Sequence, residues 1–306
     1  MAKRFSILAN KDAGAGYARA LLDAGYERVP DNRDADFLLI DCEHAGGVRK
    51  VIGNFLTNKP VFIYPHSPLA YFIWDGHYAP LPVQCNFVIG EAARLSLAAY
   101  GYSHRVEMCG WNRCEIQAFT PTSGRRLLFV PARTRGDGKY TNQAYAEMTP
   151  KAFQFVLDHR EAFDHVVVCY VRDFVNEQEY AGTGIEFVKT NPRQAVSPTL
   201  DMLRRIEEAD LVISCETVAC LAVARGKPTV VYNAKAVPAT GYIPAAQYER
   251  YRQYYEFPLA LEDMSLQDIL NVCRAPDPNV EQWKRMNIGE PFDAGKFLAV
   301  IQEHVQ

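Results

Sequence analysis

The stretch Ala209–Asn233, ADLVISCETVACLAVARGKPTVVYN, decides the fold that we expect for this chain of 306 residues. Its apolar run Leu211–Ser214 predicts a short buried strand, and the small apolar residues of Glu216–Ala224 predict a helix. Gly226 ends that helix, and the β-branched run Thr229–Tyr232 predicts a second strand. A strand–helix–strand crossover this short places its two strands side by side and parallel.

The turn after Ser214 is a predicted phosphate site. It lies where the carboxyl end of a strand meets a helix N-terminus, and unpaired N–H groups and the helix dipole attract anions there. Ser214, Glu216 and Thr217 are therefore predicted to bind such a ligand. Because a carboxylate repels phosphate, Glu216 is expected to turn outward and accept hydrogen bonds from hydroxyl groups of the ligand. A strand–helix–strand unit without any ligand has the same pattern, so both interpretations stay open.

The rest of the chain alternates apolar strands with helices, which is typical of doubly wound parallel sheets. The strands predicted before residue 112 are Phe5–Ala9, Asp36–Asp41, Pro60–Tyr64, Phe87–Ile89 and Arg105–Met108. Later strands are Arg126–Val130, Val166–Tyr170 and Ile185–Val188. Predicted helices cover residues 48–57, Glu91–Tyr100, Asn142–His159, Thr199–Glu208 and Ala294–His304. We therefore expect an α/β protein with two Rossmann-like domains.

Two motifs resemble the GT-B nucleotide-sugar enzymes, which include heptosyltransferases, MurG-like transferases, sugar 2-epimerases and CDP-glycerol transferases. Ala209–Ile213 matches their ADLVI strand, and Gly226–Pro228 matches the GKP that follows their small-residue helix. Their Ser/Thr-Gly phosphate turn is replaced here by Cys215–Thr217. The segment KDAGAGYARALLDAGYERV resembles the glycine-rich opening of the same enzymes, with Tyr17 where they often have histidine.

The resemblance implies two doubly wound domains that face each other across a cleft. Residues 1–112 are then the acceptor-side domain, and residues 125–275 bind the nucleotide-sugar. Residues 113–124, which carry Pro121 and Gly124, are predicted to form the linker. Residues 276–306 form a tail and a helix that can return to the first domain.

Two groups of residues are candidates for binding the donor. Gly14 and Gly16 let the backbone turn tightly and approach phosphate groups closely, although a plain tight turn needs them as well. Arg133, Arg135 and Lys139 place three positive charges on one loop, where guanidinium groups can bind a diphosphate. A solvated basic loop is the alternative.

His66 and Asp12 are the predicted catalytic residues. His66 follows a strand's carboxyl end, and a neutral imidazole there can take a proton from an acceptor hydroxyl. Asp12 lies in the glycine turn and is the second candidate base. His44 and Asp75 are further candidates, and a turn-capping role for His66 stays open.

Composition excludes several classes of protein. A net charge of -3 argues against a generally basic nucleic-acid surface. No apolar run approaches the roughly 20 residues that span a bilayer, and the N-terminus is typical of a first strand rather than a signal peptide. The 8 cysteines form no CxxC pair, and Cys109 and Cys114 lack a histidine pair at ligand spacing, so we expect reduced thiols and no metal site. A cytoplasmic protein is expected.

The function that the resemblance implies is glycosyl transfer. The enzyme would move a sugar from a nucleotide-activated donor to a hydroxyl acceptor, with no cofactor and no metal. The acceptor stays open between a glycan, a lipid-linked molecule and a nucleic-acid base, as do the sugar, the nucleobase, the stereochemistry and the oligomeric state. A UDP-sugar 2-epimerase and a CDP-glycerol-type phosphotransferase are alternatives on the same fold. A non-enzymatic two-lobed binding protein is a further alternative, which the lack of a signal peptide disfavours.

Overall fold

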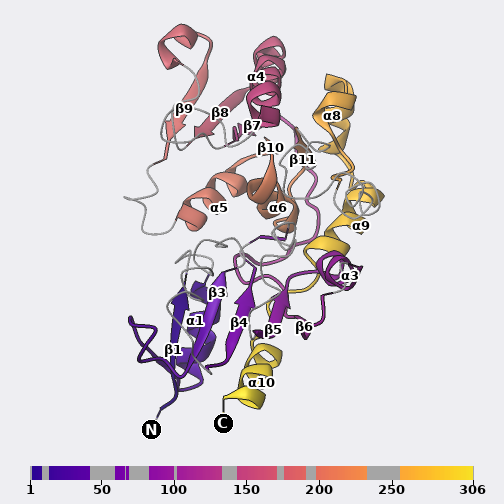
Figure 1. Cartoon of the computed structure of the whole chain (residues 1–306). Helices are drawn as coiled ribbons and strands as arrows, with labels where there is room; N and C mark the ends of the chain where they lie inside the picture. Colours follow the sequence, from indigo (N-terminus) through magenta and orange to yellow (C-terminus); the bar gives the residue numbers. More distant parts are fainter. Residues whose placement is uncertain are drawn as a thin grey trace. The chain divides into compact units, whose positions relative to one another are not determined.

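The chain forms two compact units, each built around one parallel β-sheet (Figure 1). Unit 1 comprises Met1–Arg113 and Arg285–Gln306, and unit 2 comprises Cys114–Lys284. The computed structural model describes residues 2–8, 14–41, 59–65, 67–68, 83–99, 102–132, 143–170, 176–190, 198–232 and 256–305. Two parallel sheets with helices between their strands confirm the predicted α/β class.

Unit 1 has a 6-stranded sheet in the order β2-β1-β3-β4-β5-β6, and every neighbouring pair is parallel. The strands are β1 (Arg4–Leu8), β2 (Glu27–Arg28), β3 (Phe37–Asp41), β4 (Val61–Tyr64), β5 (Val83–Val88) and β6 (Val106–Met108). Among the described residues, the helices that lie wholly within unit 1 are α1 (Ala15–Asp23), α3 (Glu91–Ala99) and α10 (Ala294–His304).

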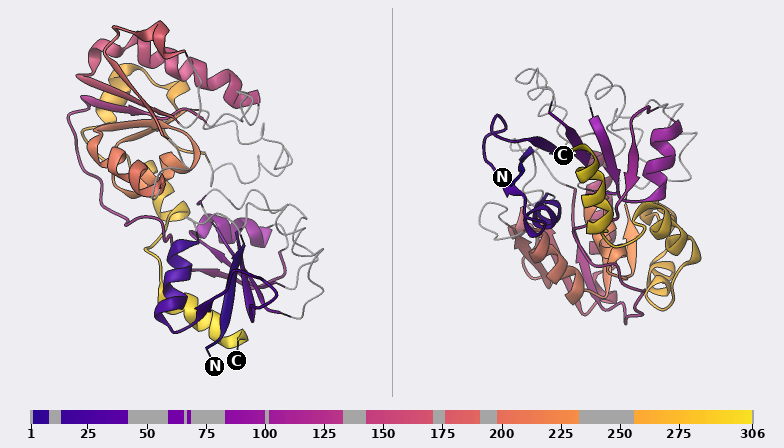
Figure 2. Two further views of the ribbon diagram at one scale, coloured as in Figure 1. Left: turned by 90° about the vertical axis from the view of Figure 1, so that its left-hand side faces the viewer. Right: turned by 90° about the horizontal axis from the view of Figure 1, so that it is seen from below.

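The core of unit 1 lies between its sheet and two helices, α1 and α10. Phe297 and Ile301 of α10 are fully buried against strand residues such as Phe87. Figure 2 shows α10 lying along the sheet of unit 1, next to α1. The sheet needs this cover because parallel strands with long apolar runs are stable only when both faces are buried. An ion pair of 3.3 Å between Lys296 Nζ and Glu107 Oε2 ties α10 to β6.

Unit 2 has a 5-stranded parallel sheet in the order β11-β10-β7-β8-β9. Its strands are β7 (Arg126–Phe129), β8 (His165–Tyr170), β9 (Ile185–Lys189), β10 (Leu211–Ser214) and β11 (Thr229–Val231). Its helices include α4 (Gln143–Asp158), α5 (Pro198–Glu208), α6 (Glu216–Ala224) and α8 (Leu266–Val272), and α9 (Pro278–Asn287) contains the boundary with unit 1. Short 3-10 turns are η2 (Arg160–Ala162), η3 (Glu177–Tyr180) and η5 (Leu261–Asp263).

Helices cover both faces of the unit 2 sheet. The chain moves from β7 through α4 to β8 in one direction and from β9 through α5 to β10 in the other. Right-handed crossovers therefore place α4 and α5 on opposite faces. Phe153 of α4 and Ile269 of α8 pack with Phe129 in one core, while α5 contacts β7 and α6 contacts β10 and β11.

The predicted crossover through β10, α6 and β11 is confirmed. The φ of Gly226 is +69°, in the left-handed region that favours glycine. Gly226 N donates to Val223 O and Lys227 N donates to Ala222 O, each at 3.0 Å, which is the Schellman arrangement that ends a helix. The chain then enters β11, which pairs in parallel with β10.

The charged residues of the same motif hold the neighbouring segments of unit 2. Asp210 Oδ2 accepts hydrogen bonds from the backbone N–H groups of Arg125 at 3.0 Å and Arg126 at 3.2 Å, which fixes the start of β7. Lys227 Nζ donates to the carbonyl oxygens of Glu207 at 2.8 Å and Ala209 at 3.1 Å, at the end of α5. In unit 2, Asp210 and Lys227 are therefore structural residues.

The segment for which we predicted a linker makes several backbone contacts within unit 2. Gln117 N donates to Ala224 O at 2.7 Å, and Thr120 N donates to Gly226 O at 2.9 Å. Thr122 N donates to Cys273 O at 2.8 Å. From Cys114 onward the segment thus runs along the end of α6 and the helix α8.

The sequence prediction missed several short elements. The two-residue strand β2 and the 7-residue helix α8 are too short for a clear hydrophobic period, although Ser265 and Asp268 cap α8 in a capping box. The predicted strand Phe87–Ile89 begins earlier, at Val83. The predicted helix at 48–57 lies outside the described residues. Within the part of the chain that the structure describes, every helix falls short of the length and apolarity that a membrane crossing needs.

We predict that Gly226→Ala destabilises unit 2 more than Gly182→Ala does. A Cβ at Gly226 would lie 1.9 Å from the carbonyl oxygen of Ala118, so strain and a backbone clash add together. Gly182 has a φ of +87° and no described atom within 4 Å of the added Cβ, so it reports the strain alone. We expect the free energy of unfolding to fall by about 3 kcal/mol or more in Gly226→Ala and by about 1–2 kcal/mol in Gly182→Ala. Urea unfolding followed by circular dichroism measures both, and equal losses would contradict the clash.

Candidate functional site

The ends of β7, β10 and β11 meet at the predicted nucleotide site. The carbonyl oxygen of Val130, just after β7, accepts a hydrogen bond from Ser214 Oγ at 3.1 Å and another from Tyr232 Oη at 3.2 Å. Ser214 is 1% exposed and Tyr232 is fully buried. The hydroxyl of Ser214 is therefore used within the protein to hold the strand ends together.

Tyr232 also explains the cysteine in the turn. Cys215 Sγ donates a hydrogen bond to Tyr232 Oη at 3.4 Å, and both side chains are buried. Burial raises the pKa of Tyr232 well above its usual value, and the neighbouring Cys215 raises it further. Tyr232 therefore stays a neutral phenol, which donates to Val130 and accepts from Cys215.

Helix α6 begins directly after this junction. Cys215 is its N-cap residue, with an extended backbone, and its side chain makes no capping hydrogen bond to the described part of α6. The first N–H groups of a helix have no partner within the helix, and the helix dipole makes this end positive. Thr217, in the first turn, is half-buried. A helix N-terminus of this kind can bind an anion through its backbone N–H groups.

Several predicted site residues lie outside the described residues. They are Asp12, His66, Arg133, Arg135 and Lys139. Glu216 is the first residue of α6, and its side chain is likewise outside the described part. The roles of these six residues stay predictions.

Gly14 and Gly16 are described, and their surroundings are the protein's own side chains. A Cβ on Gly14 would lie 2.9 Å from Tyr64 Oη and 3.1 Å from Ile7 Cγ2. A Cβ on Gly16 would lie 2.7 Å from Asn112 Nδ2. The close approach at both glycines is therefore an approach of α1 to buried or half-buried neighbours in unit 1, which a plain structural role explains.

Tyr17, at the position where the resembling enzymes often have histidine, belongs to the core of unit 1. It is fully buried, and its ring centroid lies 5.0 Å from those of Tyr64 and Phe292 and 5.2 Å from that of Phe297. The aromatic ring joins α1 to the sheet and to the C-terminal segment. Tyr17 is therefore a buried core residue at a position where the resemblance implies a polar histidine.

Sequence reasoning missed Asp41, an acidic residue at the end of a strand in unit 1. Asp41 is the last residue of β3, is fully buried, and lies in register with Tyr64 at the end of β4. Side chains two residues apart on a strand lie on the same face, so Asp41 is on the face of Leu39, which packs in the core of unit 1 beneath α1. The available signal was an acidic residue that ends an otherwise apolar strand, FLLID.

Metal ligands are not gathered among the described residues, where no group of three or more His, Cys, Asp or Glu side chains could hold an ion. Seven free cysteines are described, and six of them are buried. Burial raises the pKa of Cys85 and of Cys109 to about 12, so these thiols stay protonated.

Comparison with known proteins identifies the fold. No protein-family model and no curated protein matches the sequence. Among solved structures, the wall teichoic acid polymerase TagF matches with a TM-score of 0.51 and 9% identity, over 99% of this chain and 88% of that chain. Sucrose-phosphate synthase from Thermosynechococcus elongatus matches with a TM-score of 0.48 and 11% identity, over 99% and 97% of the two chains. TarM matches with a TM-score of 0.47 and 11% identity, over 88% of this chain and 54% of its own, so the chain spans about half the length of TarM.

The two doubly wound units and the likeness to TagF give this chain the GT-B fold, the fold of a large class of glycosyltransferases. At 9% identity the likeness concerns the fold, and the activity is argued from the site.

We predict that Tyr232→Phe lowers the free energy of unfolding by about 1–2 kcal/mol at neutral pH, because Val130 loses a buried hydrogen bond. Above the usual tyrosine pKa of 10.0, the difference between the two proteins should shrink. An unfolded tyrosine ionises there while buried Tyr232 does not, so the wild type loses about 1.4 kcal/mol per pH unit that the variant does not lose. Chemical unfolding between about pH 8 and 11 tests this. A difference that stays constant over that range would show that Tyr232 ionises equally in both states.

Proposed function

We propose that this chain is a glycosyltransferase that moves a sugar from a nucleotide-activated donor to a hydroxyl acceptor. The observation that carries the proposal is the start of α6, which follows Ser214 at the carboxyl end of a central strand in a GT-B fold. Open α/β sheets bind ligands at the carboxyl ends of their strands, and an uncapped helix N-terminus there suits a diphosphate.

The donor would bind chiefly through unit 2. Its diphosphate would accept hydrogen bonds from the first N–H groups of α6 and from the Thr217 hydroxyl. Ser214 would act indirectly, because its hydroxyl already donates to Val130. Arg133, Arg135 and Lys139 would add positive charge, and Glu216 would accept hydrogen bonds from ribose or sugar hydroxyls. A carboxylate turned toward the diphosphate would repel it.

The reaction would break the bond between the sugar's anomeric carbon and the diphosphate oxygen and form a bond to the acceptor oxygen. The acceptor proton would pass to His66 or Asp12, acting as a general base. Negative charge grows on the departing nucleoside diphosphate, and N–H groups with guanidinium groups stabilise such charge without a metal.

A glycerophosphotransferase is the second candidate. It is favoured by the likeness to TagF, whose compared structure was soaked with a ligand named CDPG. In this reaction the acceptor oxygen would form a bond to the distal phosphorus of the diphosphate. The bond from that phosphorus to the bridging oxygen would break, and a nucleoside monophosphate would leave in place of a nucleoside diphosphate. The released nucleotide therefore separates the two candidates.

We predict that one class of UDP-, GDP-, CDP- or TDP-linked donor raises the melting temperature of the protein. Thr217→Val, which replaces the hydroxyl by a methyl group, should raise the dissociation constant of this donor about tenfold. Thr183→Val is the matched control, because Thr183 is exposed and its hydroxyl donates to Tyr180 O at 2.8 Å in the turn before β9. If no nucleotide raises the melting temperature, the proposal loses its support.

For catalysis, we predict that His66→Ala or Asp12→Asn abolishes turnover and leaves donor binding unchanged, because the general base acts on the acceptor. Chromatography measures turnover through the amount of nucleotide released and shows whether that nucleotide is a diphosphate or a monophosphate. A variant with normal turnover would exclude that residue as the base.

A further inference from the structure

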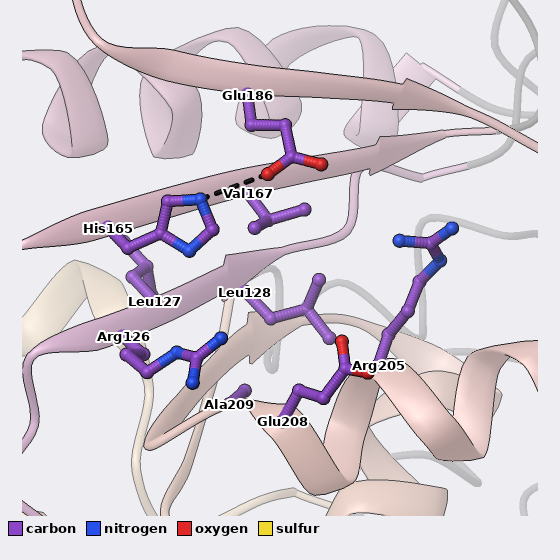
Figure 3. A pocket seen from close by; sticks show the side chains of 9 residues that line it. All are labelled: Arg126, Leu127, Leu128, His165, Val167, Glu186, Arg205, Glu208 and Ala209. Atoms are coloured by element: carbon purple, nitrogen blue, oxygen red, sulfur yellow. Dashed lines mark hydrogen bonds and ion pairs between the residues drawn. The ribbon is translucent and has the colours of Figure 1, made fainter.

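A small pocket lies on the α5 face of the unit 2 sheet, away from the strand ends described above. Its volume is about 60 Å³, and it is lined by the first residues of β7 and β8, Arg126 and His165, by Glu186 of β9, and by the end of α5 (Figure 3). Leu128 and Val167 line it as apolar neighbours. One buried water needs about 10–15 Å³ on this measure, so the pocket has room for about four to six atoms of that size.

The parallel register brings the polar residues of the pocket together. Arg126 lies opposite His165, and Val167 lies opposite Glu186, so Arg126, His165 and Glu186 come from three adjacent strands. His165 Nε2 and Glu186 Oε2 are 3.0 Å apart, which fixes the imidazole. Figure 3 shows the second ring nitrogen, Nδ1, turned to the side of Arg126.

The carboxylates around the pocket are already engaged, whereas one guanidinium is not. Glu186 faces His165, and Glu208 Oε1 accepts a hydrogen bond from Arg204 at 2.7 Å. Arg205 Nε donates to Asp201 at 3.4 Å. Among the residues that the structure describes, the guanidinium of Arg126 has neither a hydrogen bond nor an ion pair, and Figure 3 shows it directed into the pocket.

We propose that this pocket binds a small oxyanion of the phosphate class. The guanidinium of Arg126 matches two phosphate oxygens in a bidentate arrangement. The imidazole of His165 is held at Nε2 by Glu186, 3.0 Å away, and its Nδ1 is the atom that can form a third hydrogen bond with the oxyanion. A phosphate beside Arg126 also balances the positive charge of the guanidinium.

This oxyanion site is separate from the proposed donor site. It lies at the amino ends of the strands, whereas the start of α6 follows the carboxyl end of β10. The five steps between the 6 residues of β8 span about 17 Å, at about 3.3 Å each, so the two sites lie at opposite ends of the strands of one sheet. Its ligand is therefore a second phosphate-bearing molecule and not the donor's diphosphate.

The test is a titration of the intact protein with inorganic phosphate, followed by the side-chain nitrogen signals of His165 in an NMR spectrum at weakly acidic pH. We expect a saturable shift with a dissociation constant of about 1 mM, the range for a small ligand held by a few hydrogen bonds. Arg126→Gln should weaken binding about tenfold or more.

Arg125→Gln is the matched control. Arg125 is the preceding residue, and its guanidinium pairs with Asp164 at 3.1 Å, so its loss should leave phosphate binding unchanged. Wild-type protein without a saturable shift, or an Arg126→Gln variant that binds like the wild type, would overturn the proposal.

Two further ligands define the chemical class. Methyl phosphate should bind like inorganic phosphate if phosphate esters are accepted, and weaker binding of methyl phosphate would restrict the site to the free ion. Acetate should bind at least several-fold more weakly, because it offers two oxygens where phosphate offers four; equal binding would overturn the phosphate assignment. These results do not depend on nucleotide binding, so this site and the proposed donor site can fail independently.

Discussion

The carbonyl oxygen of Val130 is the point on which the geometry of unit 2 depends. A carbonyl has two acceptor positions, and here two buried hydroxyls, of Ser214 and Tyr232, occupy both. Leaving either buried group without its partner costs about 1–3 kcal/mol, so the three strand ends hold one relative position. Cys215 follows Ser214 directly, and the start of α6 is fixed with it.

The sheet of unit 2 presents different chemical groups at the amino ends and at the carboxyl ends of its strands. At the carboxyl ends of the strands, the described side chains of Ser214, Cys215 and Tyr232 are held by hydrogen bonds within the protein, and the helix α6 begins directly beside them. At the amino edge the groups are long charged side chains, Arg126 and His165, which stand beside each other because their strands are parallel and in register. The proposed donor site would therefore depend mainly on backbone groups, and the proposed oxyanion site on side chains.

The motif residues that carry the resemblance to GT-B enzymes serve mainly to build the fold. Asp210 holds the start of β7, Lys227 holds the end of α5, and Gly226 ends α6. Tyr17, in place of a histidine, packs α1 against Phe297 of the C-terminal helix. A chain can thus keep the architecture of this class while the polar groups at the strand ends change, which is why the fold alone does not define the substrate.

The sequence by itself determined the local elements. Apolar runs, small-residue helices and Gly226 predicted the crossover through β10, α6 and β11, because each signal acts within a few residues. Only the tertiary structure brought Tyr232 to Val130, 102 residues away, and His165 to Glu186, 21 residues away. It also revealed buried Asp41 and the use of Ser214 inside the protein. Strand order and register decide which of these residues come into contact. The near-continuous apolar runs of strands that are buried on both faces do not define the strand order, because each run fits any interior position of a parallel sheet.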